Sequence, residues 1–365
     1  MIPRPIRLLP VIIACALPQA RAVDITLDYS LDSNGFFAAN PEAIPIMEAV
    51  AGYYSSILTD TLNPIASTSP NVGPDFQSST EVGWDFQPNV VHPGTGQVGF
   101  GLRTTGNQVS IAQDEVRIYT GGRVLNGPLG KGGPGGTGSF QLTGSFDGIT
   151  FFTTEQALAA QNNMFSRGEG GGTQADTDGP TATEFAPWGG SVSFATDANW
   201  YFDLTPDDFA DDFNAIPAGM NDFTSVAFHE VGHALGLGTA DSWYNLVDGN
   251  NRFLGPEAMA ALGSIPPTYP DDGDAHWAED TMSTNILGQA QEAMMDPNLL
   301  VGSRKLPTLL DLAALSDIGW SVAAQQFEED PVAVPAVPAP LLGILALFTL
   351  LAGARARPAL SRRRP

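Results

Sequence analysis

The chain has 365 residues, with 40 Asp and Glu against 16 Lys and Arg and a formal net charge of −24. So acidic a chain argues against nucleic acid as a partner, because phosphate groups are bound by Lys and Arg. The length is sufficient for a large hydrophobic core, and the one cysteine, Cys15, leaves no second cysteine for an internal disulfide. We therefore expect a folded domain that is stable without disulfide bonds.

Both ends of the chain have the pattern of targeting segments. Residues 1–22 place Arg4 and Arg7 before an apolar run and end in Ala20-Arg21-Ala22, as in a secretory signal peptide with an A-x-A cleavage site; a buried strand or helix is the alternative. At the other end, a Pro-rich linker (325–340) precedes an apolar segment (341–354) and an Arg-rich end (355–365). The apolar segment is short for a membrane span, and the Arg cluster is expected to stay cytoplasmic.

Without the signal peptide and the segment from 341 onward, the chain would keep eight Lys and Arg and all 40 Asp and Glu, a net charge of −32. Such a charge favours solubility outside the cell and makes Ca²⁺ a second candidate ion, since hard cations prefer carboxylate oxygens. A solvated acidic surface is the commoner interpretation of acidic runs. The candidate clusters are Asp203, Asp207, Asp208, Asp211 and Asp212, and separately Asp271, Asp272 and Asp274.

In chain order, a first strand is predicted over 23–29, and 41–62 has the apolar spacing of a long helix. Residues 61–90 are rich in Pro, Ser, Thr and Asn, which predicts a loop. The stretch 121–138 contains nine Gly and is predicted to be a mobile loop, compatible with an insertion near the rim of a cleft. Short strands are predicted over 97–102, 108–112, 116–120, 138–142 and 191–194.

The most informative stretch is His229-Glu230-Val231-Gly232-His233. Two histidines four residues apart lie on one face of a helix, where they can hold one Zn²⁺. The Glu between them can act as a general base on water held by the metal. We predict a helix over 223–235, with Asn221-Asp222 at its N-cap and Gly236 as its C-terminal stop. A helix with two ordinary histidines is the alternative.

The run from His229 to Gly236 has the form HExxHxxG and resembles the metzincin metallopeptidases. The common metzincin pattern has a third His three residues after the Gly, where this chain has Thr239, and a hydroxyl is a poor zinc ligand. Another residue must therefore complete the site. His276 is the candidate, with a surface histidine in an acidic loop as its alternative reading; the fallback ligands are Asp241, Glu257 and His92.

The His276-Trp277 pair and the later segment 291–297 resemble the leishmanolysin branch of the metzincins. In that branch the third His lies beyond an insertion, in a His-Trp pair, and is followed by a Glu-x-Met segment that forms the Met-turn. The resemblance implies His276 as the third ligand and Met295, directly before Asp-Pro, as the Met-turn methionine, with Met294 in the core.

The fold implied is α+β: a metzincin-like catalytic domain of two subdomains over 23–324. A mixed, twisted sheet and the active-site helix form the upper subdomain (23–236). A loop-rich lower subdomain (237–324) ends in a closing helix. Apolar spacing predicts a short helix over 256–262 and the closing helix over 306–318.

Val337-Pro338-Ala339-Pro340, the apolar segment and the Arg cluster resemble a variant of the PEP-CTERM sorting signal of Gram-negative bacteria, with Ala339 where Glu is usual. The resemblance implies an exosortase-type sorting enzyme as partner and a place outside the cell or on its surface. The C-terminal helix would enter the inner membrane only before processing. A simple C-terminal membrane anchor is the alternative.

Together these patterns predict a secreted or surface-sorted zinc endopeptidase that acts on proteins or peptides, with Glu230 as general base. One alternative is a catalytically silent surface or matrix protein that keeps the fold, against which the intact Glu230 argues. A second is a zinc hydrolase with a substrate other than protein. Cleavage of protein that a zinc chelator blocks separates the three.

Overall fold

The computed structural model describes residues 23–66, 83–102, 109–137, 141–143, 145–146, 149–150, 167, 181–206, 209 and 216–323. The chain divides into two compact units, Met1–Gln325 and Gln326–Pro365, and every described residue belongs to the first. The predicted signal peptide, linker, C-terminal apolar segment and Arg-rich end lie outside the described residues. None of the helices within the described ranges is long and apolar enough to cross a membrane.

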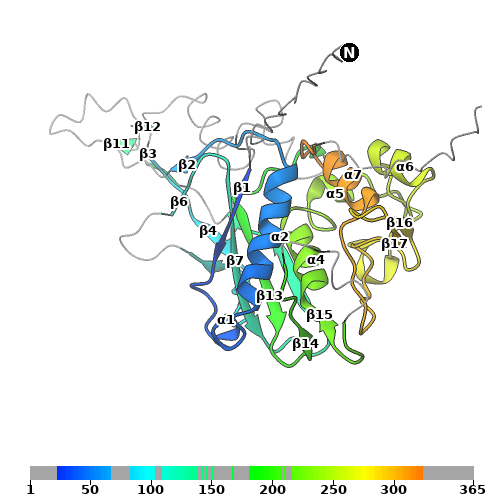
Figure 1. Ribbon diagram of the computed structural model, residues 1–365. Helices are drawn as coiled ribbons and strands as arrows, with labels where there is room; N and C mark the ends of the chain where they lie inside the picture. Colours follow the sequence, from blue (N-terminus) through cyan, green and yellow to red (C-terminus); the bar gives the residue numbers. More distant parts are fainter. Residues whose placement is uncertain are drawn as a thin grey trace, which may run out of the picture. The chain divides into compact units, whose positions relative to one another are not determined.

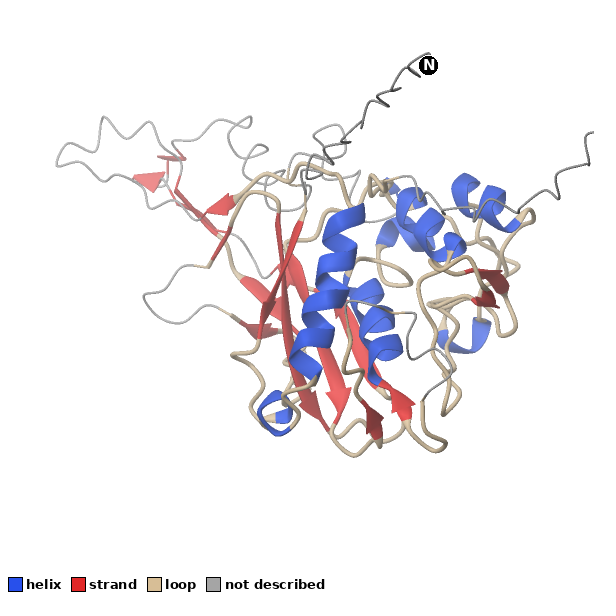
Figure 2. Ribbon diagram, in the orientation of Figure 1, coloured by secondary structure: helices blue, strands red, loops and turns tan. Residues whose placement is uncertain are grey.

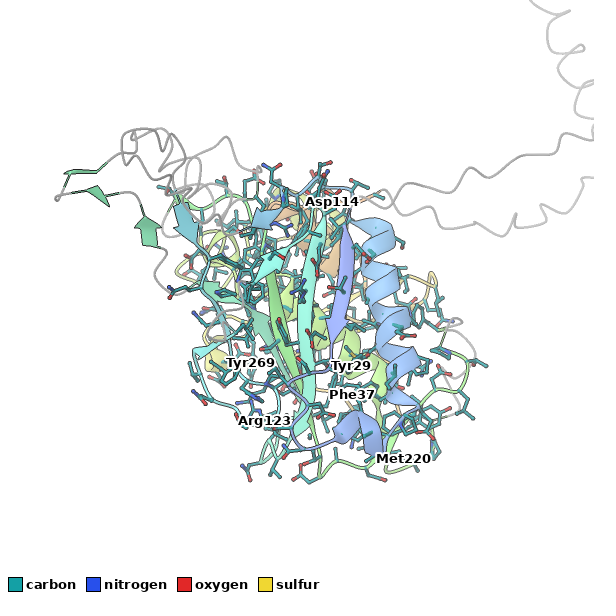
Figure 3. All side chains as sticks on the ribbon, turned by 90° about the vertical axis from the view of Figure 1, so that its left-hand side faces the viewer. Tyr29, Phe37, Asp114, Arg123, Met220 and Tyr269 are labelled. Carbon is teal, nitrogen blue, oxygen red and sulfur yellow. The ribbon has the colours of Figure 1, made fainter. Side chains whose placement is uncertain are left out.

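A mixed four-stranded sheet is the framework of the first unit (Figure 1). β7 pairs in parallel with β1 on one side and with β13 on the other, and β8 pairs antiparallel with β13 at the edge. β7 runs the length of the sheet, from beside Asp114 to Arg123 (Figure 3). With the helices described next, the fold belongs to the α+β class, as predicted. The strand order is β1 (Asp24–Asp28), β7 (Glu115–Arg123), β13 (Gly189–Ala195) and β8 (Gly130–Pro134).

Two helices, α2 (Ala43–Ile57) and α4 (Phe223–Ala234), cover one face of the sheet (Figure 2). A four-residue helix, α1 (Phe36–Ala39), precedes them. The predicted helix 41–62 is too long, because Leu58 turns to an extended conformation and pairs with Val322. Tertiary pairing with the far end of the domain therefore ends α2 earlier than its apolar spacing indicates.

The prediction of a mobile loop over 121–138 is wrong. This stretch contains the end of β7, the whole of β8 and the short strand β9 (Gly136–Thr137). Within β8, Lys131 pairs with Ser193 and Gly133 with Ser191. The alternation that identifies a strand depends on side chains, and glycine has none, so the sequence pattern could not reveal β8. A glycine strand also marks a place where another part of the backbone can approach closely.

The other described strands of the first half are short and lie outside the central sheet. The predicted loop over 61–90 overlooked three of them. Of the predicted strand over 138–142, residues 138–140 lie outside the described residues, and the remainder belongs to a strand at Gln141–Thr143. The pairs are β2 (Ile65–Ala66) with β6 (Ser110–Ile111), β3 (Gly83–Asp85) with β10 (Gln141–Thr143), β4 (Pro88–Val90) with both β5 (Phe100–Gly101) and β9, β11 (Ser145–Phe146) with β12 (Ile149–Thr150), and β14 (Trp200–Tyr201) with β15 (Asn221–Asp222).

After α4 the described chain is rich in loops, as predicted. The last helix begins later than predicted because Thr308 is its N-cap: the Thr308 hydroxyl accepts from the Asp311 N–H, and the Asp311 carboxylate accepts from the Thr308 N–H. The predicted helix over 256–262 has the bounds observed. The elements are α5 (Asp241–Tyr244), α6 (Pro256–Leu262), the 3₁₀ helix η4 (Pro270–Asp272), the hairpin β16 (Met282–Thr284) and β17 (Ala290–Glu292), and α7 (Leu309–Asp317).

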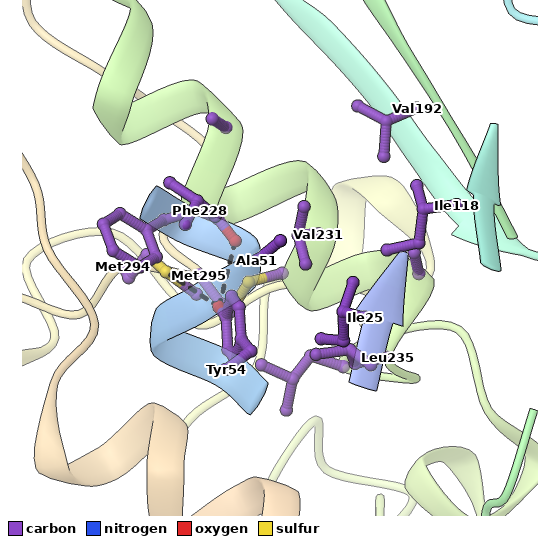
Figure 4. Close-up of a cluster of buried hydrophobic side chains, with 14 of the residues drawn as sticks. Ile25, Ala51, Tyr54, Ile118, Val192, Phe228, Val231, Leu235, Met294 and Met295 are labelled. Carbon is purple, nitrogen blue, oxygen red and sulfur yellow. Dashed lines mark hydrogen bonds between the residues drawn. The ribbon is translucent and has the colours of Figure 1, made fainter. Parts of the chain in front are cut away.

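One hydrophobic core joins the sheet, both long helices and the loop-rich half (Figure 4). Val231 and Leu235, at the C-terminal half of α4 and just after it, pack toward the sheet, while Met294 and Met295 reach the same core from the loop-rich half. The Tyr54 hydroxyl of α2 donates to the backbone oxygen of Phe228, at 3.0 Å, and lies 3.7 Å from the Met294 sulfur. The helix with the HExxH motif is therefore held from both sides.

Candidate metal centre

Helix α4 is fixed at both ends. Its N-cap, Asp222, accepts the Ser225 N–H at 3.1 Å and also binds the buried Arg304 guanidinium through both carboxylate oxygens, each at 2.9 Å. At the other end Gly236 has φ +103°, and the Leu237 N–H bonds back to the Gly232 oxygen. The predicted cap and stop are both confirmed, and they set the rotation of the face that bears the histidines.

The structure brings three histidines together. His229 and His233 are one turn apart on α4, and His276 follows η4 in the loop-rich half. The Nε2 atom of His276 lies 3.0 Å from the Nε2 of His229 and 3.0 Å from the Nε2 of His233. A segment more than forty residues further along the chain thus supplies the third imidazole.

The hydrogen bonds of the Nδ1 atoms indicate which nitrogen of each imidazole carries the proton. The Nδ1 of His229 bonds to the Met294 backbone oxygen at 2.9 Å, and that of His233 to the Leu237 oxygen at 2.8 Å. Because a carbonyl oxygen can only accept, we assign the proton to Nδ1 in both rings, which leaves lone pairs on Nε2. His276 directs its Nδ1 at the Asp272 carboxylate. Lone pairs that converge in this way fit a cation between them.

The donor set fits zinc in particular. Three neutral imidazoles are a known ligand set for a catalytic Zn²⁺ that keeps a fourth position open. Among the residues that the structure describes, these three form the one group of His, Cys, Asp and Glu side chains close enough to share an ion. An outer carboxylate on a ligating His, as Asp272 provides for His276, is the usual second partner in such sites.

Burial keeps two of the ligands uncharged. Removal from water, and secondarily the neighbouring histidines, lowers the pKa of His229 well below its usual range. The same causes lower the pKa of His233 to about 3. Both rings are therefore neutral at neutral pH, which is the form that binds a metal.

Glu230 lies beside the histidines in a cleft of about 560 Å³. Its side chain is almost fully buried, and burial raises its pKa to about 8, although a hydrogen bond from the Gly132 N–H and the positive charge of Lys131 act in the opposite direction. The cleft lies between β8 and α4 on one side and the segment Met294–Leu299 on the other. A carboxylate in this place can exchange protons with a molecule bound in the cleft.

Met294 and Met295 lie against the histidine-bearing helix. Met295 is fully buried, and a Cβ placed on Gly232 would be 3.1 Å from its sulfur. Met294 presents its backbone oxygen to His229 and its side chain to the core. The segment predicted as the Met-turn thus lies against α4 and His229.

The other candidate ligands lie elsewhere. The Thr239 hydroxyl donates to the His233 backbone oxygen at 2.6 Å, and so completes the end of the helix. The fallback residues Asp241, Glu257 and His92 do not belong to the group that can share an ion. Thr239 therefore has a structural contact where the common pattern has a ligand.

The acidic clusters suggested for calcium have other partners where they are described. Asp203 pairs with Arg304 at 2.8 Å, Asp272 bonds to His276, and Asp274 accepts from Asn251 and Thr268. Asp207, Asp208, Asp211 and Asp212 lie outside the described residues. Calcium binding stays a prediction.

The sequence reasoning missed two supporting carboxylates. Asp272 lies four residues before His276, a spacing that was visible in the sequence. Asp311 of α7 accepts five hydrogen bonds: from the Trp277 indole, from the N–H groups of Met294 and Met295, and from the N–H and hydroxyl of Thr308. The Thr308-x-x-Asp311 spacing was the available signal for it, as a capping box.

Comparison with known proteins adds one finding. The family model of the matrixins matches residues 138–247, a range that includes His229, Glu230 and His233 but ends before His276. Searches of curated proteins and of solved structures gave no match. The match, the mixed sheet and the three-histidine cluster together support a zinc metallopeptidase of the metzincin type.

Proposed function

We propose that this chain is a zinc-dependent endopeptidase in which His229, His233 and His276 hold the ion and Glu230 is the general base. The observation that carries the proposal is the convergence of three Nε2 atoms next to a buried carboxylate in a cleft. Bound zinc would supply a Lewis acid that polarises a carbonyl group and lowers the pKa of water.

In this proposal Glu230 moves the proton. It takes a proton from water as the water oxygen forms a bond to the peptide carbonyl carbon. It then delivers that proton to the amide nitrogen as the C–N bond breaks, so the products are a carboxylic acid and an amine, which exchange a proton to become a carboxylate and an ammonium group. Burial raises the pKa of Glu230 to about 8, and the positive charge of a bound zinc ion would lower it again, which favours a carboxylate that can accept and return a proton near neutral pH.

The edge strand β8 supports a peptide as substrate. Hydrogen bonds from Ala195 to Leu129 and from Gly135 to Gly189 mean that odd-numbered residues turn their backbone groups to β13. Gly130 and the Gly132 carbonyl therefore turn to the open edge, along the cleft, while the Gly132 N–H bonds to Glu230. An extended peptide fits such an edge by adding a strand.

The test is cleavage of casein by the purified chain with zinc bound. We expect Glu230→Gln to keep stoichiometric zinc and to lose at least about 100-fold in kcat, the usual contribution of a general base. Glu48→Gln, an exposed substitution on α2, is the matched control and should cleave as the wild type does. A chelator should abolish cleavage, and added zinc should restore it.

Either of two results would overturn the proposal. Casein cleavage that survives Glu230→Gln would remove Glu230 from its role. A zinc-loaded wild type that cleaves neither casein nor a library of peptides would favour the catalytically silent surface protein, or a zinc hydrolase with another kind of substrate. Absence of bound zinc would contradict the ligand set itself.

The finer classification rests on sequence resemblance. We propose the leishmanolysin branch, from His276-Trp277 and from Met295 as the Met-turn methionine. His276 lies in the histidine cluster, and Met295 lies against α4, which supports this choice. Replacement of His276 by Ala should remove zinc and activity, and retention of both would exclude this branch as the source of the third ligand.

We further propose export and sorting through the two ends of the chain. The support is the order of charged, apolar and small residues in 1–22 and the Pro, apolar and Arg order after 331. Mass spectrometry of the protein from its host should find a chain that starts near Val23 and lacks the Arg cluster. An intact C-terminus in the membrane fraction would instead indicate a simple anchor.

A further inference from the structure

The glycine-rich strand β8 makes unusually close contact with the residue proposed as general base. A Cβ placed on Gly130 would lie 2.5 Å from Cγ and 2.7 Å from Cδ of Glu230. A Cβ placed on Gly132 would lie 2.8 Å from the backbone carbonyl carbon of Glu230 and 2.9 Å from its Cα. Real Cβ atoms do not occur at such distances, so a side chain at position 130 would displace the Glu230 side chain, and one at position 132 would displace the Glu230 backbone.

The two glycines meet different parts of Glu230. Gly130 faces the side chain, whereas Gly132 faces the backbone, and the Gly132 N–H also donates a hydrogen bond to the carboxylate. Residues 130 and 132 point to the same face of the strand, because successive residues alternate. One face of β8 therefore lies in close contact with a single residue of α4, Glu230.

We propose that Gly130 and Gly132 are positioning residues, which hold the Glu230 carboxylate in one place beside the three histidines. Gly130 leaves the space that the side chain occupies, and Gly132 supplies both the close backbone contact and the N–H that orients the carboxylate. This inference rests on the proposed function, since it gives the glycines a role in proton transfer by Glu230. It also explains why β8, in the glycine-rich stretch 121–138, has glycine at these two positions, which the metal site alone does not explain.

Contact with Glu230, rather than strand formation, is what requires glycine here. Gly133 is the neighbour of Gly132 on the same strand, and a Cβ placed on it would meet nothing within 4 Å. Its backbone φ also lies outside the left-handed region. Gly133→Ala is therefore a matched control, because it makes the same chemical change in the same strand without touching Glu230.

The decisive substitution is Gly130→Ala. The three atoms nearest to the new Cβ all belong to the Glu230 side chain, so the carboxylate must move while the histidines stay in place. We expect zinc content to be unchanged and kcat on casein to fall about 100-fold, as for a catalytic group displaced by about 1 Å. Gly133→Ala should keep wild-type kcat.

A melting-temperature cycle tests the contact without any use of activity. Gly130→Ala should lower the melting temperature of the metal-free protein by about 2–5 °C, the usual effect of overpacking in a domain of this size. In a Glu230→Ala background the same substitution should cost almost nothing, because the atoms it would meet are gone. An equal loss in both backgrounds would overturn the proposed contact.

Activity separates the inference from the function on which it rests. If the wild type cleaves casein and Gly130→Ala cleaves equally well with the same kcat, the positioning role is wrong while the peptidase stands. If the zinc-loaded wild type cleaves nothing, the peptidase proposal fails, and the melting cycle alone decides whether β8 holds Glu230. Should Gly130→Ala fail to fold, the folded Gly130→Ala, Glu230→Ala double variant would still demonstrate the clash.

Discussion

At the scale of single residues, the bond between His276 and Asp272 has the clearest consequence. His276 is the one proposed ligand that does not come from α4, and the Asp272 carboxylate binds its Nδ1. An anionic partner fixes the ring orientation and makes the Nε2 lone pair a stronger donor. Asp272 would therefore act on a bound metal ion through His276 without touching the ion.

We predict that Asp272→Asn weakens zinc binding about 10- to 100-fold, as measured by competition with a chromogenic chelator. Asp271→Asn is the matched control, since it removes the adjacent acidic charge and leaves the bond to His276 intact. An equal loss of zinc affinity in both variants would mean that only the local negative charge matters. A loss confined to Asp272→Asn would establish the hydrogen bond as the cause.

Residues of the site differ in how far the sequence could predict them. His229, Glu230 and His233 could be predicted because a helix brings positions i and i+4 together whatever the rest of the chain does. His276 needed a family resemblance, since no local rule places a residue 43 positions after His233. Gly130 could not be predicted at all, because its role is the space that a side chain would take.

At the scale of elements, Asp311 holds the closing helix α7 to the segment predicted as the Met-turn. Its carboxylate is fully buried and binds the N–H groups of Met294 and Met295 together with the Trp277 indole. Because the Met294 backbone oxygen also accepts from His229, α7 is connected to a proposed zinc ligand through one intervening residue.

We predict that Asp311→Asn lowers the free energy of unfolding by about 2–4 kcal/mol, because an amide cannot accept all five hydrogen bonds and leaves buried donors unpaired. Zinc affinity should fall as well, since the position of Met294 relaxes. Denaturant unfolding and chelator competition measure the two effects. Asp317→Asn on the same helix removes bonds to Glu257 and Ala258 only, and should leave zinc affinity unchanged.

Glu115, at the start of β7, gives a prediction that depends on pH. Burial acts to raise its pKa, but hydrogen bonds from Ala112, Thr26 and Arg117 outweigh burial and hold the pKa below 4.5. A carboxylate whose pKa falls on folding stabilises the fold above its unfolded value of 4.5, and that contribution is lost as the pH falls through the folded value.

Glu115→Gln should therefore cost about 1 kcal/mol of stability at neutral pH, and the cost should shrink as the pH falls below 4.5. Urea unfolding of both proteins across this range measures the difference. A difference that stays constant with pH would mean that the charge of Glu115 contributes nothing. A difference that grows on acidification would reverse the sign of the pKa shift.

Elements whose side chains repeat with a helical period were predicted well. The helix over 256–262 and α4 have almost the bounds that apolar spacing and capping residues indicate. Where prediction failed, tertiary structure decided: Leu58 leaves α2 to pair with Val322, and β8 forms from glycines because β13 offers it an edge. Neither partner is visible in a short window of sequence.

At the scale of the whole domain, the histidine cluster joins the sheet-and-helix half to the loop-rich half. Two ligands belong to α4 and the third to the chain after η4, so an ion held by all three connects both halves. The Nε2 atoms of His229 and His233 each lie 3.0 Å from the Nε2 of His276. Zinc should therefore stabilise the domain as a whole as well as complete the cleft.

We predict that free zinc at 100 times its Kd raises the free energy of unfolding by about 2.7 kcal/mol, which corresponds to about 4 °C in melting temperature for a domain of this size. Glu230→Gln should keep this shift, because it leaves the ligands intact. His276→Gln should lose most of it. His92→Gln is the control, since His92 binds Gly94 outside the cluster. A shift that survives His276→Gln but not His92→Gln would place the ion elsewhere, and the two halves would then be connected by the hydrophobic core and by polar contacts such as that between Asp222 and Arg304.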